Sequence, residues 1–128
     1  MDQTETHIWV QTWLDYLATQ GRSKHTLSAY RRAISHLANW SQTTYGELFD
    51  PAHLIARDIR DWKSYQQTVE QAAPSTINQR LVGVASFYKW AVTNNPHSAP
   101  DFDICRIIFA VELIGKYAWL HDNTSIRI

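Results

Sequence analysis

Two long stretches of the chain combine basic and hydrogen-bonding side chains with a complete lack of acidic ones. No Asp or Glu occurs at residues 16–46 or at residues 71–100. These stretches contain Lys, Arg, Asn, Gln, Ser and Thr, whose ammonium, guanidinium, amide and hydroxyl groups bind phosphate well, the charged ones most strongly. The basic residues in them are Arg22, Lys24, Arg31, Arg32, Arg80 and Lys89. The pattern favours a polar, negatively charged partner.

The later stretch is predicted to form a helix from about residue 74 to Thr93. Pro74 stands just ahead of a Ser-Thr start, and apolar residues then recur at spacings of three and four, at Ile77, Leu81, Val84, Tyr88 and Ala91. At about 100° per residue, the opposite face carries Asn78, Gln79, Ser86 and Lys89.

The earlier stretch is predicted to form a helix that begins after Ser23 and extends to about Trp40. Ser23 is a suitable N-cap because its hydroxyl can accept from the free amides of the first turn. One face is apolar, with Leu27, Tyr30, Ile34, Leu37 and Ala38. The other face is polar, with Arg32, Ser35, His36 and Asn39. The sequence Ser41-Gln-Thr-Thr is expected to end this helix.

Two further helices would position these faces. One runs from about Thr4 to Gln20 and ends at Gly21. Asp50-Pro51 indicates a cap and a first turn, and residues 56–70 form another helix that follows a short turn at 53–55. Its apolar residues are Ile59, Trp62 and Val69. Without any alternating strand pattern, these elements predict an all-α domain, a small four-helix orthogonal bundle.

The motifs in these helices resemble those of one protein family. Ser75-Thr-Ile-Asn-Gln-Arg-Leu and Ser86-Phe-Tyr-Lys-Trp-Ala are similar to the last main helix of the core-binding domain of tyrosine recombinases, the phage integrases. Ser23, Thr26 and Tyr30 match the Ser-x-x-Thr-x-x-x-Tyr pattern that opens an earlier helix of that domain. The resemblance covers most of residues 9–96, in order.

The resemblance implies a SAM-like helical domain at residues 1–96 that forms half of a C-shaped clamp around a recombination half-site. Its partner would be double-stranded DNA, together with other recombinase protomers. The positions carried over as DNA contacts are Ser23, Lys24, His25, Thr26, Tyr30, Arg31, Ser75, Thr76, Asn78, Arg80 and Lys89. The polar faces of the two helices add Arg32, Gln79 and Ser86. At Gln79 the family often has a basic residue.

Structural interpretations compete with these assignments. Tyr30 lies on an apolar stripe and also fits a core position, and Arg80 lies at the flank of its stripe and also fits an internal pair. The formal net charge is zero, which differs from the basic footprint of a strong DNA binder. A few basic residues on a helix are also typical of an ordinary solvated face.

The residues that would carry catalysis in this family are not found together. No histidine is followed three positions later by Arg, and Tyr117 lies apart from any such group, where we interpret it as a packing residue. The six histidines have no metal-ligand spacing, and no glycine-rich phosphate loop occurs. We therefore expect a non-catalytic domain with no metal, cofactor or small-molecule substrate.

Residues 97–128 form a linker and an apolar tail that does not resemble the start of a catalytic domain. Ile104 to Leu120 is apolar nearly all round, which predicts a buried helix. It packs on the bundle, pairs with another copy or is a remnant of a larger domain. A protein-interaction or dimerisation module acting through this tail is therefore the alternative function.

The same features predict where the protein acts. A single cysteine, Cys105, fits a reducing compartment, no secretory signal opens the chain, and the charged residues in the tail argue against a membrane span. We expect a cytoplasmic, prokaryotic protein that is associated with the nucleoid when bound to DNA.

Overall fold

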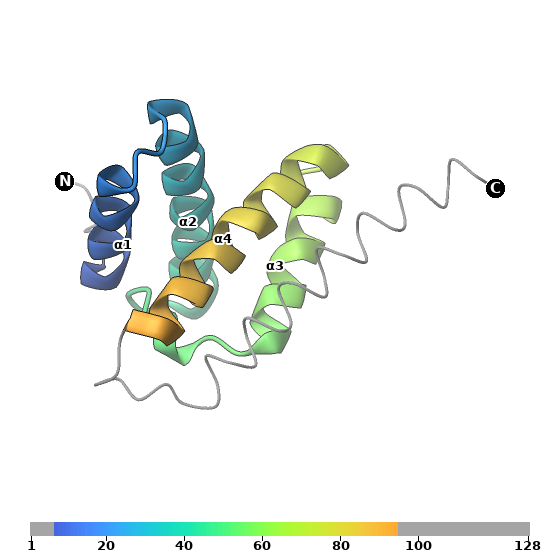
Figure 1. Cartoon of the computed structure of the whole chain (residues 1–128). Coiled ribbons are helices and arrows are strands. Elements are labelled where there is room, and N and C mark those ends of the chain that lie inside the picture. The colour runs from blue at the N-terminus through green and yellow to red at the C-terminus, as the bar shows by residue number, and fades with distance from the viewer. Residues whose placement is uncertain (1–6, 95–128) are drawn as a thin grey trace.

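The computed structural model describes residues 7–94, which form four α-helices and one short 3₁₀-helix, η1 (Figure 1). The elements are α1 (Ile8–Thr19), α2 (Lys24–Tyr45), η1 (Pro51–His53), α3 (Ala56–Thr68) and α4 (Pro74–Asn94). The described residues contain no strand, so the predicted all-α class is confirmed. The predictions for the tail, including Tyr117 and the helix at 104–120, lie outside the described residues.

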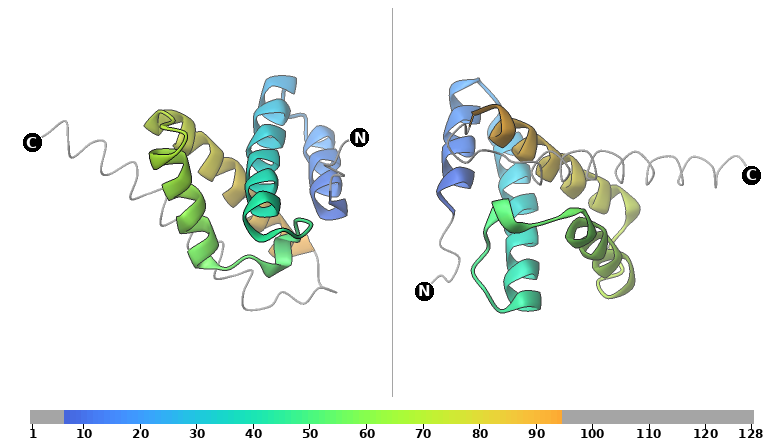
Figure 2. Two further views of the ribbon diagram at one scale, coloured as in Figure 1. Left: turned by 180° about the vertical axis from the view of Figure 1, so that it is seen from behind. Right: turned by 90° about the horizontal axis from the view of Figure 1, so that it is seen from below.

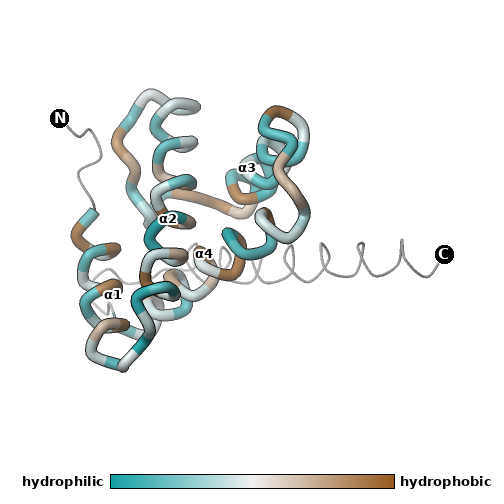
Figure 3. The backbone as a smooth tube through the Cα atoms, turned by 90° about the horizontal axis from the view of Figure 1, so that it is seen from above, coloured by the Kyte–Doolittle hydropathy of each residue, from teal (hydrophilic) through white to brown (hydrophobic). Residues whose placement is uncertain are grey.

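The helix α4 crosses the bundle diagonally and joins its other parts. In Figure 1, α1, α2 and α3 stand beside one another and α4 runs across them, and Figure 2 shows the same arrangement from behind and from below. Its most extensive contact is with α2, and it also contacts α1 and α3. Hydrophobic and hydrophilic residues alternate along the helices (Figure 3), as expected for amphipathic elements.

The apolar stripes predicted for the helices meet in one core. Trp13 stacks on Tyr30 with ring centroids 5.5 Å apart and meets Phe87 edge-on at 5.4 Å. Trp13, Trp62 and Phe87 are almost completely buried. Burying a large apolar side chain contributes roughly 1.5–3 kcal/mol, so these aromatic residues account for much of the stability. All the predicted stripe residues of α4 lie in the core: Ile77, Leu81, Val84, Tyr88 and Ala91.

The crossing of α2 and α4 is unusually close because α4 has a glycine there. A Cβ atom placed on Gly83 would lie 2.8 Å from the Cβ of Ala33 and 3.6 Å from a ring carbon of Tyr30. A glycine inside a helix costs about 1 kcal/mol relative to alanine. The backbone approach that Gly83 permits explains why a glycine is suitable at this position.

The helix ends differ in part from the sequence-based expectations. Ser23 is the N-cap of α2 and its Oγ accepts from the amide of Thr26 at 3.1 Å, as predicted. However, α1 begins at Ile8 rather than near residue 4, with His7 as its N-cap. The prediction that residues 41–44 break α2 was wrong. The helix continues to Tyr45 because Trp40 and Ser41 are buried against the core, and Gly46, in the left-handed conformation, ends it.

The buried face of α3 also differs from the sequence-based prediction. Ile59 and Trp62 are buried as predicted, but Val69 is 66% exposed, whereas Gln66 is completely buried. The helix ends at Thr68, and Val69 forms its C-cap. Gln66 lies four residues after Trp62, and this spacing continues the buried stripe. The last residue of the buried face of α3 is therefore the polar Gln66.

Hydrogen bonds fasten the segment around η1. The Asp50 side chain accepts from the amide of Ala52 at 3.0 Å, which confirms the predicted cap. The buried Tyr88 hydroxyl donates to the carbonyl oxygen of Pro51 at 2.7 Å, and burial raises the pKa of this phenol. Tyr45 donates to Asp58, and burial together with this bond raises the pKa of Tyr45 to about 12.

We expect Gly83→Ala to destabilise the domain by about 1 kcal/mol. Overpacking a close contact costs about 1–3 kcal/mol, which exceeds the gain of about 1 kcal/mol in helix propensity. Urea unfolding followed by circular dichroism measures the difference. Val82→Ala, at an exposed position of the same helix, is the control and should change stability by less than about 0.5 kcal/mol. An increase in stability for Gly83→Ala would show that the crossing is not tight.

Candidate nucleic-acid interface

A groove of about 780 Å³ lies between α2 and α4. The amino-terminal halves of these two helices diverge from each other (Figure 1). No acidic residue belongs to the lining of the groove, within the part of the chain that the structure describes. The lining residues are His25, Thr26, Ala29, Tyr30, Arg31, Arg32, Ala33, Ser35, His36, Asn39, Thr76, Asn78, Gln79, Arg80 and Val82. The close crossing therefore brings the two acid-free stretches of the sequence into one surface.

Most of the predicted contact residues line this groove. They are His25, Thr26, Tyr30, Arg31, Arg32, Thr76, Asn78, Gln79 and Arg80. The others lie outside its lining: Ser23, Lys24, Ser75, Ser86 and Lys89. Tyr30 contributes to the groove and also stacks on Trp13, so it serves the core as its place on the apolar stripe suggested. Arg32 is exposed, and its guanidinium donates to the Ser28 hydroxyl at 3.3 Å.

The helix starts offer fewer free amides than the sequence suggested. At the start of α4, the amide of Thr76 donates to the carbonyl oxygen of Ala73 at 3.0 Å, and Pro74 has no N–H. At the start of α2, the amide of Thr26 is bonded to the Ser23 hydroxyl. Phosphate contacts in this groove would therefore come mainly from side chains.

Arg80 is held inside the protein on one edge of the groove. Its guanidinium donates to Oε1 of the buried Gln66 at 2.9 Å and to the Glu70 carboxylate at 3.3 Å. The structure thus agrees with the internal pairing that the position of Arg80 on the helix flank suggested. The bond to Gln66 also satisfies an amide oxygen that has no access to water, which is a structural role.

His36 belongs to the same network and not to a solvated face. Its Nδ1 accepts from the indole N–H of Trp62 at 2.9 Å, and its Nε2 lies 2.8 Å from the Glu70 carboxylate. Because Nδ1 accepts, the ring proton is on Nε2 and is donated to Glu70. Glu70 therefore contacts side chains from both walls of the groove and links them to α3 through Trp62.

Asn78 has a buried oxygen without a partner. Its Oδ1 is inaccessible and accepts no hydrogen bond in the described structure. An unsatisfied buried acceptor costs about 1–3 kcal/mol. The residue lines the groove, but its side-chain oxygen is not available there.

Val82 lines the groove but was not among the predicted contacts, and the same is true of Ala29, Ala33, Ser35, His36 and Asn39. An exposed line of residues follows α4 at spacings of three and four: Ser75, Gln79, Val82 and Lys89 are exposed, and Ser86 is half-buried. Val82 is 56% exposed at the centre of this line. Its position off the apolar stripe of α4, next to Leu81, was visible in the sequence, but polar residues alone were considered as contacts.

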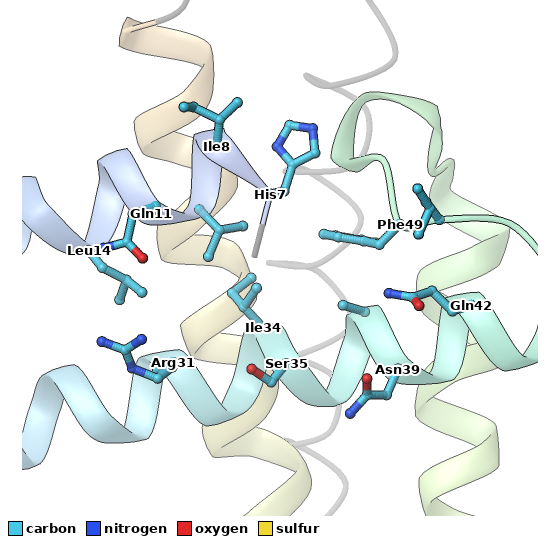
Figure 4. Close-up of a pocket in the computed structure, with 13 residues that line it drawn as sticks. His7, Ile8, Gln11, Leu14, Arg31, Ile34, Ser35, Asn39, Gln42 and Phe49 are labelled. Atoms are coloured by element: carbon cyan, nitrogen blue, oxygen red, sulfur yellow. The ribbon is translucent and has the colours of Figure 1, made fainter. Parts of the chain in front are cut away.

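A second, more apolar groove of about 560 Å³ lies on the other flank of α2 (Figure 4). It is formed by the start of α1, by α2 and by the segment before η1, and its apolar lining includes Val10, Leu14, Ile34 and Phe49. Two further lining residues, Ile8 and Leu48, are 70% and 77% exposed. Arg31, Ser35 and Asn39 contribute to both grooves.

Residues 7–94 contain neither a helix suited to span a membrane nor a cluster suited to hold a metal ion. None of the helices there has both the length and the apolar character needed to cross a membrane. The same residues contain no group of three or more His, Cys, Asp or Glu side chains that could hold a metal ion.

A family comparison agrees with this architecture. The model of the phage integrase N-terminal SAM-like domain matches residues 9–97, which include all four helices. The chain therefore belongs to the phage integrase, or tyrosine recombinase, family through this domain. The match covers the N-terminal SAM-like domain only. No curated protein and no solved structure matched the chain.

We expect Arg80→Ala to lower the free energy of unfolding by about 1–3 kcal/mol, because it leaves the buried Gln66 oxygen without its donor. Arg31→Ala removes the same charge from an exposed position of the neighbouring helix and should change stability by less than about 0.5 kcal/mol. Thermal or urea unfolding distinguishes the two. Equal stabilities of the variants would contradict a structural role for Arg80.

Proposed function

We propose that this chain is the DNA-binding, core-binding domain of a tyrosine site-specific recombinase. It binds double-stranded DNA at a recombination half-site through the groove between α2 and α4, and it is not catalytic by itself. The observation that carries this proposal is the acid-free lining of that groove. Family membership supports the same function, because integrases act on DNA.

The charge distribution explains how a chain with zero net charge can bind a polyanion. Arg31 and Arg32 are exposed at the groove, whereas the exposed acid Asp61 lies on α3. Only local charge acts over short distances, because at physiological ionic strength the Debye length is about 8 Å. The Glu70 carboxylate at the edge of the groove is paired with Arg80. The exposed Arg31 and Arg32 therefore give the groove a positive surface for phosphates.

The two helices that form the groove, α2 and α4, would make different kinds of contact with DNA. Basic residues on α2 neutralise phosphates and supply affinity that does not depend on sequence. Hydroxyl and amide groups on α4 can reach base edges in the major groove, whose width admits an α-helix. Phosphate contacts then fix the orientation in which α4 meets the bases.

The rest of the assignment follows from this role. Residues 1–96 are the DNA-binding unit, and residues 97–128 are a linker and tail without catalytic residues. The unit would work in the cytoplasm of a prokaryote, on the nucleoid, beside a catalytic domain and other recombinase protomers. It needs no metal, cofactor or small-molecule substrate for this task.

We expect the chain to bind a duplex with an affinity that falls steeply as salt rises, because phosphate contacts release counterions. Arg32→Ala should weaken binding to all sequences and reduce the slope of log K against log salt by about 1. Lys89 lies outside the groove lining but on the exposed line of α4 that contains Gln79 and Val82, so Lys89→Ala should also weaken binding to all sequences about equally. Fluorescence anisotropy at several salt concentrations measures both effects.

Arg60→Ala is the matched control for this experiment. Arg60 is exposed on α3 and does not line the groove, so its removal changes the net charge equally without touching the proposed surface. If Arg60→Ala weakened binding as much as Arg32→Ala, the attraction would come from net charge and not from this groove.

A protein-interaction module is the second candidate function, and the apolar groove in Figure 4 favours it. Ile8 and Leu48 expose apolar surface there, which suits contact with another protomer.

We expect self-association, if this second function is correct, to raise the mass measured by light scattering as concentration increases. Leu48→Glu should reverse the increase if the groove is used, and removal of the residues after Pro96 should reverse it if the tail is used. A monomer at all concentrations would exclude this function.

A further inference from the structure

An exposed valine lies in the middle of the polar line on α4. Val82 is 56% exposed and lines the groove, whereas Ile77, Leu81 and Val84 of the same helix are buried. Its methyl groups therefore contribute little to the core. On this line Val82 stands between the polar residues Gln79 and Ser86. An exposed valine at a nucleic-acid interface is suited to one feature of the major groove, the thymine 5-methyl group.

Gln79 is the polar residue placed to act together with Val82. It is exposed and lines the same groove. It lies three residues before Val82, a spacing that brings Cβ atoms on a helix surface within about 5–6 Å. Successive bases of one DNA strand are about 3.4 Å apart. Two such residues on a helix in the major groove can therefore face the same or neighbouring base pairs.

The neighbours of Gln79 are less able to read bases. Arg80 is bonded to Gln66 and Glu70, so the guanidinium that would favour guanine is occupied. The oxygen of Asn78 is buried, so this amide cannot offer a donor and an acceptor together. Gln79 can offer both, and a bidentate glutamine pairs with adenine N6 and N7.

We infer that α4 reads A·T base pairs, with Gln79 on adenine and Val82 against a thymine methyl group on the same or an adjacent base pair. The inference rests on the proposed function and adds to it the base preference and the residues that determine it. The groove contains no acid that would favour cytosine by accepting from its N4 amino group.

The experiment begins with the full chain and a random duplex library, from which the preferred sequence is selected. Each thymine in that duplex is then replaced by uracil, which lacks the 5-methyl group, and each adenine by 7-deazaadenine, which lacks N7. One uracil should weaken binding about 4-fold, as expected for one buried methyl group. One 7-deazaadenine should weaken it by about 5-fold or more.

The variants assign these effects to residues. Val82→Ala should bind the thymine duplex about 4-fold more weakly and should no longer distinguish thymine from uracil at that position. Gln79→Ala should lose the sensitivity to 7-deazaadenine while keeping the sensitivity to uracil. Val69→Ala is the control, because Val69 is also an exposed valine but lies outside the groove, and it should behave like the wild type.

The outcomes separate the two proposals. If the chain binds no duplex even at low salt, the proposed function fails and this inference fails with it. If the chain binds DNA but Val82→Ala retains the full preference for thymine over uracil, the base-reading role of Val82 is wrong and the DNA-binding function stands. Loss of both preferences in the corresponding variants, and not in Val69→Ala, establishes the inference.

Discussion

The close crossing of α2 and α4 is the constraint on which the rest of this structure depends. It exists because Gly83 presents no side chain to Ala33 and Tyr30. The groove lies beside this crossing, between residues 25–39 of α2 and residues 76–82 of α4. A larger residue at position 83 would change the spacing of the helices and also the geometry of the groove. Stability and the candidate interface are therefore coupled through one backbone contact.

A polar network around Glu70 supports this geometry from the side of α3. Glu70 contacts His36 from α2 and Arg80 from α4, and His36 is in turn bonded to the buried Trp62 of α3. Arg80 also satisfies Gln66. The acidic side chain nearest to the groove is thus used to hold its walls together. Arg80, which was predicted to contact DNA, therefore has a structural role. Arg31 and Arg32 remain as the main exposed charges of the groove.

The positive and negative charges of this chain are unevenly distributed over its surface, although their sum is zero. A net charge of zero would argue against a nucleic-acid partner if the charges were evenly spread. Here the acid-free stretches come together in the fold, and exposed acids such as Asp15 and Asp61 lie on α1 and α3. The family match to an integrase N-terminal domain provides an independent reason to associate such a surface with DNA. The second, apolar groove on the other flank of α2 offers a separate surface for contacts between proteins, although Arg31, Ser35 and Asn39 line both grooves.

The sequence by itself determined the elements of this protein, since the spacing of apolar residues is a local property of each helix. The stripe of α4, the cap at Ser23 and the turn at Asp50-Pro51 could all be predicted in this way. The end of α2 could not, because packing of Trp40 and Ser41 against the core outweighs the weak helix propensity of residues 41–44. Only the tertiary structure decided which polar residues face the groove. Arg80 and His36 are bound by partners from other helices, and the packing of α2 beside α4 places the exposed Val82 in the groove lining. Such contacts join residues that are far apart in sequence, so no local sequence pattern predicts them.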